Sequence, residues 1–125
     1  MKIKFQKYQG TGNDFIIIDN TNLSFPSENN FLIKKLCDRK YGIGCDGLIL
    51  INPSKSSDFS MNYYNSDGNL GSMCGNGARC SVKFAQNLNI INNNTVFTAY
   101  DGLHDALIFD DLITLSMKPV RDIKS

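Results

Sequence analysis

The chain has 125 residues, and its 13 Lys and Arg nearly balance 12 Asp and Glu, which leaves a net charge of +1. This length suits one domain, and 42% hydrophobic residues is enough for a sizeable core. The balanced charge argues against nucleic acid as a partner, and the short apolar runs argue against a membrane. No signal-peptide pattern opens the sequence, so its four cysteines indicate reduced thiols. We expect a soluble, cytoplasmic domain.

The first half of the chain predicts strands around one helix. Residues 2–8 alternate polar and apolar side chains, as a half-buried strand does, and residues 15–19 form a second strand after a Gly-rich turn. Ser27 is placed to cap a helix over residues 28–37. A buried strand at 48–51 and an alternating strand at 59–64 follow, and the turn at 65–68 uses Gly68 for a positive φ.

The second half begins with a helix of small residues. The spacing of Ala78, Val82, Ala85 and Leu88 predicts a helix that starts at residue 75 or 76. Strands are then expected at 95–99, 103–109 and 112–117. The pattern predicts a mixed, strand-rich α+β fold in a single domain over residues 1–118. Residues 119–125 are expected to be a tail or the start of a linker.

The residues best suited to chemistry gather at 73–80, which read MCGNGARC. Two glycines around Asn76 at a helix start leave backbone N–H groups open to a ligand. Cys74 lies at the positive end of that helix, which favours the thiolate over the thiol. A thiolate beside a carboxylate-binding site can act as a base toward an amino or hydroxy acid. An isolated Cys is more often a buried core residue, but this setting favours the catalytic interpretation.

The other cysteines and the single His give weaker signals. Cys80 lies about 240° around the helix from Cys74 and is expected in the core. Cys37 ends an apolar helix face and is also expected to pack. Cys45 lies in a Gly-rich turn that either adjoins a site or simply turns the chain. His104 is expected on the surface of a strand, and without a Cys-x-x-Cys pair no metal site is predicted.

Three turns carry asparagines that could hold a ligand: Asn13, Asn65 and Asn76. An Asn side chain offers both a donor and an acceptor without charge, which suits a zwitterionic amino acid. Each turn by itself is more often an Asx-turn. The glycine motifs of nucleotide-binding sites do not occur, which argues against a nucleotide ligand.

Four motifs together resemble the diaminopimelate epimerase family. They are residues 7–15 (KYQGTGNDF), 38–47 (DRKYGIGCDG), 65–68 (NSDG) and 73–80 (MCGNGARC). Each motif is weak alone, but four in this order with appropriate spacing are specific. The resemblance implies half of an epimerase fold, in which a strand barrel wraps around a central helix. It also implies an isomerase of lysine and peptidoglycan precursor biosynthesis, which interconverts LL- and meso-diaminopimelate without a cofactor.

The resemblance implies roles for particular residues. Cys74 is one of two cysteines that remove and return the α-proton from opposite faces of the substrate. Backbone N–H groups at the helix start would hold the α-carboxylate and stabilise the developing charge. The substrate-binding positions are Asn13, Asn65, Gly75 and Asn76. Some members of the family carry Gln where this chain has Gly47, so a side-chain contact there is absent or is made by the backbone.

The motifs match the first half of the family, and the second Cys is missing. Cys37, Cys45 and Cys80 lack the context to replace it. We expect an excised or truncated half; the alternatives are a chain that pairs with a separate second half, and a homodimer that faces one Cys74 with another. Other functions stay open: an epimerase or racemase of the same fold with another substrate, a non-catalytic amino-acid-binding module, or a thiol redox protein, which no Cys-x-x-Cys supports.

Overall fold

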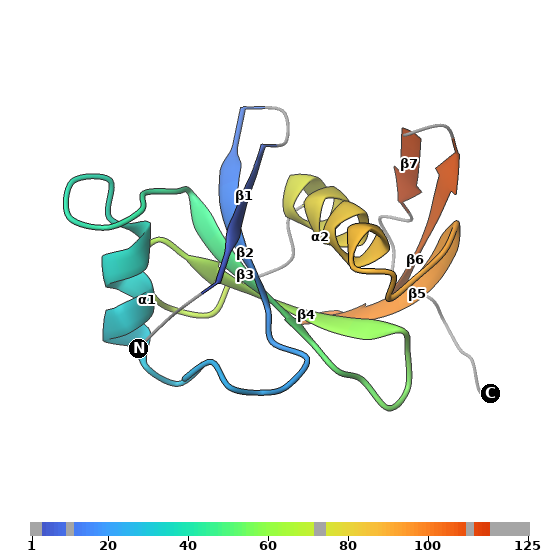
Figure 1. The fold of residues 1–125 in the computed structure, drawn as a ribbon, viewed down its shortest axis with the longest axis horizontal. Helices are drawn as coiled ribbons and strands as arrows, with labels where there is room; N and C mark the ends of the chain where they lie inside the picture. The colour runs from blue at the N-terminus through green and yellow to red at the C-terminus, as the bar shows by residue number, and fades with distance from the viewer. Residues whose placement is uncertain (1–3, 10–11, 72–74, 110–111, 116–125) are drawn as a thin grey trace.

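The computed structural model describes residues 4–9, 12–71, 75–109 and 112–115, which form one sheet and two helices (Figure 1). The strands are β1 (Gln6–Gln9), β2 (Asp14–Asp19), β3 (Gly47–Asn52), β4 (Phe59–Asn65), β5 (Asn94–Ala99), β6 (Gly102–Phe109) and β7 (Leu112–Leu115). The helices are α1 (Asn30–Cys37) and α2 (Gly75–Asn87). The order of the strands in the sheet is their order along the chain.

Two pairs of neighbouring strands are parallel, and each is joined through a helix. β2 and β3 are parallel, as are β4 and β5, and the other neighbours are antiparallel. Parallel neighbours need a crossover connection. The chain therefore passes through α1 between β2 and β3, and through α2 between β4 and β5.

The central strands are buried on both faces, because each helix covers one of them. Phe15 and Ile17 of β2 pack in the core with α2, whereas Ile16 and Ile18 pack in the core with α1. β3 divides its apolar side chains in the same way. This double burial explains why these two strands read as continuous apolar runs in the sequence.

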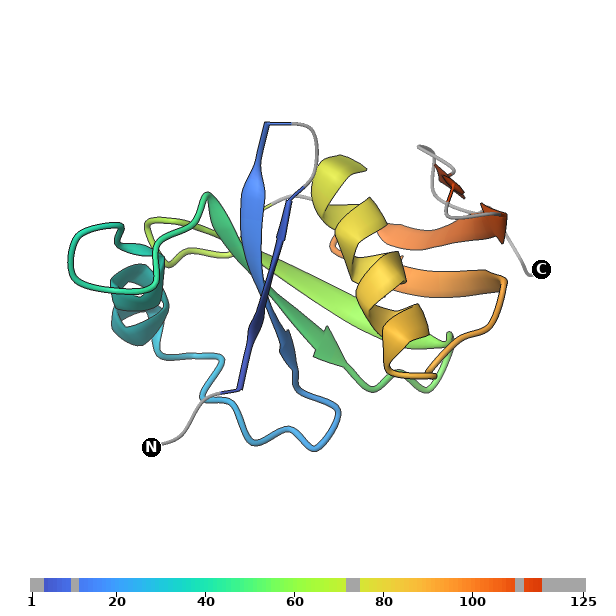
Figure 2. The same cartoon turned by 45° about the horizontal axis from the view of Figure 1, so that its top comes forward.

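The sheet curves around α2. Figures 1 and 2 both show α2 held between the first strands of the sheet and β5 to β7. Gly77 brings the helix close to the sheet, since a Cβ there would lie 3.3 Å from Ile49 Cδ1 and 3.7 Å from Phe15 Cζ. The expected α+β half, a strand barrel around a central helix, is confirmed as a seven-stranded half-barrel over the described residues.

Helix α1 starts later than predicted, and Ser27 is not its cap. Asn29 precedes the helix and accepts a hydrogen bond from Leu32 N on its side chain (3.0 Å). Ser27 lies in the preceding turn, where its carbonyl accepts from the Tyr64 hydroxyl (3.4 Å). Asn29 caps instead because the chain folds back at Pro26, whose carbonyl accepts from Asn29 N. Asn is as favourable a capping residue as Ser, so the turn decides which of them caps the helix.

The predicted strands shift by a few residues, and one side-chain placement is wrong. β1 begins at Gln6, so Lys4 and Phe5, which were expected in this strand, lie outside it. His104 was expected on the surface but is completely buried on β6. It stacks on Phe97 at 5.6 Å, and its Nε2 lies 2.7 Å from Asp101 Oδ1. Asp101 gives the buried imidazole a hydrogen-bond partner, which offsets the cost of burying a polar ring in the core.

The proposed end of the domain lies outside the described residues, as does the expected tail at 119–125. Within the described part of the chain, neither helix has the length and apolar character that crossing a membrane requires.

Candidate functional site

The start of α2 lies beside the turn between β1 and β2, although the two are far apart in sequence. Asn76, in the first turn of α2, donates a hydrogen bond from Nδ2 to Oδ1 of Asn13 (3.0 Å). Figures 1 and 2 both place the first turn of α2 next to this end of β2. Two of the asparagines singled out in the sequence are therefore in direct contact.

Asp46 fixes the other end of the Asn13 amide. Asn13 Nδ2 donates to Asp46 Oδ2 (3.3 Å), and the same oxygen accepts from the backbone N–H of Asp14 (3.1 Å). A carboxylate can only accept here, so it orients the Asn13 amide with its oxygen toward Asn76. This role could not be predicted from local patterns, because Asp46 comes next to Asn13 through the parallel pairing of β2 with β3.

A cluster of opposite charges supports this corner. Arg39 bonds both Asp14 (2.8 Å) and Asp46 (3.0 Å) through its Nη2, and Lys7 Nζ lies 3.2 Å from Asp14. The Arg39 guanidinium holds the pKa of the Asp14 carboxyl well below its usual range, against the opposing effect of partial burial. The Asp14 side chain is 14% exposed and that of Arg39 is 58% exposed, so this pair is only partly shielded from solvent.

Asn65 reaches the same edge of the sheet through the strand register. It ends β4, where it is paired with Gly47, and Gly47 is in turn paired with Phe15 of β2. The predicted turn that follows is confirmed: Gly68 has φ +92° and donates to the Asn65 carbonyl (2.9 Å). The Asn65 side chain lies against Gly71, where a Cβ would come within 2.9 Å of it.

Two further predicted site residues, Gly75 and Asn76, stand at the start of α2. Gly75 is its first residue, and Cys74 lies outside the described residues, as do 72 and 73. The first four N–H groups of a helix have no partner within it, and they carry the positive end of its dipole. An anionic group of a ligand can therefore be held at Gly75 and Asn76.

The other three cysteines are buried and free of disulfides. Cys80 faces the core under α2, and Cys37 packs beneath α1, as expected for both. Cys45, whose role was open, packs in the same core as Cys37 and donates from its backbone N–H to the Cys37 carbonyl (3.1 Å). A hydrogen bond to Cys45, together with burial, raises the pKa of the Cys37 thiol. These thiols are packing residues of the core.

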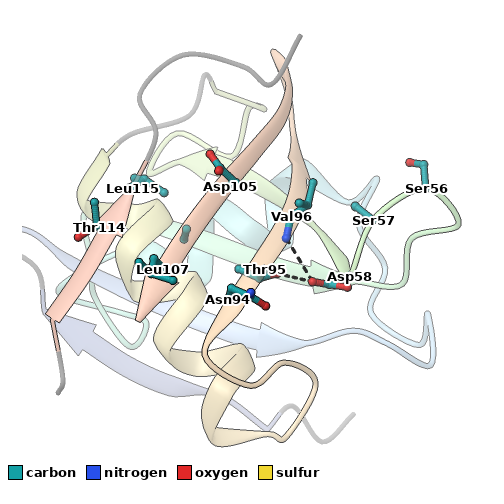
Figure 3. A pocket seen from close by; sticks show the side chains of 11 residues that line it. Ser56, Ser57, Asp58, Asn94, Thr95, Val96, Asp105, Leu107, Thr114 and Leu115 are labelled. Carbon is teal, nitrogen blue, oxygen red and sulfur yellow. Dashed lines mark hydrogen bonds between the residues drawn. The ribbon is translucent and has the colours of Figure 1, made fainter. Parts of the chain in front are cut away.

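One surface groove lies away from all of these residues. It has a volume of about 690 Å³ and runs over β5, β6 and β7 (Figure 3). Its buried polar residue, Thr95, is already paired: Thr95 Oγ1 donates to Asp58 Oδ2 (2.8 Å), which also accepts from Val96 N (3.2 Å). Asp58 therefore joins the start of β4 to β5, and the groove contains none of the predicted site residues.

Comparison with known proteins identifies the family of this chain. Residues 5–111 match the family model described as diaminopimelate epimerase. The chain belongs to the diaminopimelate epimerase family. It is 60% identical over 122 residues to a diaminopimelate epimerase of Flavobacterium psychrophilum and 38% identical over 123 residues to one of Campylobacter jejuni. These alignments cover 97% and 98% of this chain but 48% of each relative, so the chain spans about half their length.

Solved structures of related fold are more distant in sequence. A methylitaconate-delta-isomerase matches 90% of this chain with a TM-score of 0.65 at 13% identity, and the match covers 62% of that protein. A probable proline racemase of Agrobacterium radiobacter matches 93% with a TM-score of 0.64 at 15% identity, over 42% of its length. These likenesses establish the fold of the epimerase half.

Proposed function

We propose that this chain supplies one half of the active site of a diaminopimelate epimerase, and that it acts in the cytoplasm on LL- and meso-diaminopimelate. The observation that carries the proposal is the hydrogen bond between Asn76 and Asn13. It joins two motifs of the sequence at the helix start that follows Cys74. A polar corner with an adjacent helix start suits a zwitterionic amino acid.

The reaction would need a base on each face of the α-carbon. On one face the Cys74 thiolate takes the α-proton onto its sulfur, and the electron pair of the broken C–H bond moves into the α-carboxylate. N–H groups at Gly75 and Asn76 would stabilise the charge that develops there. A second Cys, as the thiol, then returns a proton from the opposite face and is left as a thiolate. No electrons are gained or lost, so no redox cofactor is needed.

The second Cys would come from outside this chain. The chain covers 48% of its epimerase relatives, which leaves room for a second half of similar length in the same protein. A separate chain, or a second copy of this one that faces Cys74 with its own Cys74, would serve the same purpose. Sedimentation at high protein concentration that shows monomer alone would exclude the second copy.

The direct test follows the α-proton of LL- and meso-diaminopimelate in D2O by proton NMR. Exchange with inversion by this chain means that a two-base site assembles, whereas exchange restored by adding a second half identifies the missing partner. If a reconstituted protein with both halves binds but exchanges no α-proton, the proposal is wrong. Cys74→Ser is the matched variant, because it removes the thiolate and keeps the size of the side chain.

Thiol labelling tests the role of Cys74 independently. Cys37, Cys45 and Cys80 are buried, so iodoacetamide should label a single site quickly in the folded protein. The labelled peptide should contain Cys74. As the pH is lowered, the rate of labelling should begin to fall only at a pH below the ordinary thiol pKa of about 8.5. Uniformly slow labelling of all four cysteines would contradict an activated thiolate.

A non-catalytic amino-acid-binding module is the second candidate, favoured by the coverage of half of each relative. It shares the ligand site and lacks the second base. In that case Cys74→Ser leaves ligand binding nearly intact, and no added second half produces exchange.

A further inference from the structure

The ring of Tyr63 fills the space beside Gly47. A Cβ built on Gly47 would lie 2.5 Å from Tyr63 Cε1, 2.6 Å from its Oη and 2.8 Å from its Cζ. Such distances are shorter than any real Cβ contact. Gly47 does not have the positive φ that would favour glycine, so its backbone accepts other residues. What demands a glycine here is the neighbouring phenol ring.

Tyr63 lies on the side of the sheet that α2 covers. It follows Phe59 and Met61 along β4 with the same strand parity, and these three side chains pack in one core. The Tyr63 ring meets Phe15 edge-on, with centroids 6.1 Å apart. Phe15 in turn lies beneath Gly77 in the first turn of α2. The ring therefore extends along the sheet beneath the start of the helix.

The hydroxyl end of Tyr63 reaches the edge of the sheet where the candidate site lies. The hydroxyl lies beside Gly47. Gly47 follows Asp46 in the chain and is paired with Asn65 of β4. Asp46 holds Asn13. The phenol oxygen is thus brought close to the strand ends that carry Asn13 and Asn65, and the Tyr63 side chain is half-buried there.

We propose that Tyr63 is a specificity-determining residue, whose hydroxyl contacts the amino acid bound at this site. This inference rests on the proposed function. A phenol hydroxyl is both donor and acceptor, so it can bond an ammonium or a carboxylate of the ligand without adding charge. Gly47 makes the contact possible, because any side chain at position 47 would occupy the same space and turn the ring away. A side chain at position 47 and the ring of Tyr63 would thus occupy the same space in the site.

The test titrates meso-diaminopimelate into ¹⁵N-labelled protein and follows the side-chain amides of Asn13 and Asn76 by NMR. Tyr63→Phe keeps the ring and loses the hydroxyl, so the affinity should fall about three- to ten-fold while the unfolding midpoint stays close to wild type. Gly47→Ala should weaken binding to a similar extent, because its methyl group displaces the ring. Tyr100→Phe, an exposed tyrosine between β5 and β6, is the control and should change nothing.

The outcomes separate this inference from the function on which it depends. If the wild-type protein shows no shift with meso- or LL-diaminopimelate at millimolar concentration, alone or with a second half added, the proposed function fails and this inference falls with it. If the wild type binds and Tyr63→Phe binds equally well, the function stands and the role of Tyr63 is wrong. A parallel loss of affinity and folding stability in Tyr63→Phe would show a structural role and also overturns the proposal.

Discussion

The Asn76 side-chain amide donates to the side-chain oxygen Oδ1 of Asn13 (3.0 Å), and Asn13 Nδ2 in turn donates to Asp46 Oδ2 (3.3 Å). An amide that donates at one end and accepts at the other has a defined orientation. The carboxylate of Asp46 sets that orientation, since it can only accept. The three residues come from α2, the turn before β2 and the segment before β3, so the sheet must be formed before this chain of hydrogen bonds exists.

Asp46→Asn should therefore disturb ligand binding. The new amide can donate as well as accept, so the Asn13 amide is free to turn over. We expect about a three- to ten-fold loss of affinity for meso-diaminopimelate, the range of one hydrogen bond. Calorimetric titration measures it, and Asp105→Asn on the exposed face of β6 is the control. An unchanged affinity in folded Asp46→Asn would show that Asp46 does not orient the site.

The ion pairs of Asp14 predict how stability responds to acid. Because Arg39 lowers the native pKa of Asp14, the unfolded state, with an ordinary pKa of about 3.9, binds a proton first as the pH falls. This contribution is fully present above that unfolded pKa and is lost below it, as the pH falls through the native pKa. Arg39→Met should remove much of it, so at pH 7 the variant should unfold at a lower urea concentration than the wild type.

The measurement is urea unfolding at several pH values between 2 and 7. The wild type should lose stability more steeply below pH 4 than Arg39→Met does, so the two curves approach each other in acid. Lys55→Met, an exposed residue without a resolved ion pair in the described structure, is the control for a lost positive charge. Curves that stay parallel down to pH 2 would contradict the assignment to Asp14.

Much of the fold could be predicted from local patterns. The apolar runs of β2 and β3 and the Gly-rich start of α2 identified the central elements, because burial and helix geometry leave regular marks in a sequence. The partner of each strand leaves no such mark. Asp46 therefore escaped notice: the parallel register of β2 with β3 brings it to Asn13, 33 residues away.

The one misjudged side chain, His104, did leave a signal. His104 shares strand parity with Ala106 and Ile108, which face the core, so the alternation already indicated an inward side chain. A polar ring favours the surface, but here strand parity decides, so the predicted surface placement is wrong. Tyr63 likewise shares parity with Met61. Its relation to Gly47 could not be foreseen, since it depends on how β4 pairs with β3.

Gly77 tests how tightly α2 packs on the sheet. A methyl group there would lie 3.3 Å from the terminal methyl of Ile49, which can shift slightly. Gly77→Ala should stay within about 1 kcal/mol of wild type, because better helix propensity offsets the contact. Gly77→Val adds branches that face Ile49 and Phe15, and should cost about 1–3 kcal/mol. Thermal unfolding measures both, and Arg79→Val on the exposed face of α2 is the control.

Equal stabilities for Gly77→Ala and Gly77→Val would mean that the helix can move away from the sheet. In that case the position of Asn76 would not be fixed by packing. The same two variants should then also bind meso-diaminopimelate equally well, which the titration described above can check.

Asn20 is a buried polar residue whose importance the sequence did not reveal. It is 3% exposed and lies after β2. Its Nδ2 donates to Asn52 Oδ1 (2.7 Å), and its Oδ1 accepts from the backbone N–H of Phe25 (2.9 Å). One side chain thus ties the loop before α1 to the end of β3. Asn20→Leu has a similar volume but leaves both partners without their bond.

We expect Asn20→Leu to lower the free energy of unfolding by about 1–3 kcal/mol, the cost of leaving buried polar groups unpaired. Urea unfolding measures it, and the exposed Thr21→Val provides the control for a nearby polar-to-apolar change. Asn20 lies at the opposite end of β2 from Asn13, so the folded variant should bind ligand as the wild type does. A stability equal to wild type would show that the loop before α1 holds its place without Asn20, through the packing of Phe25 in the α1 core.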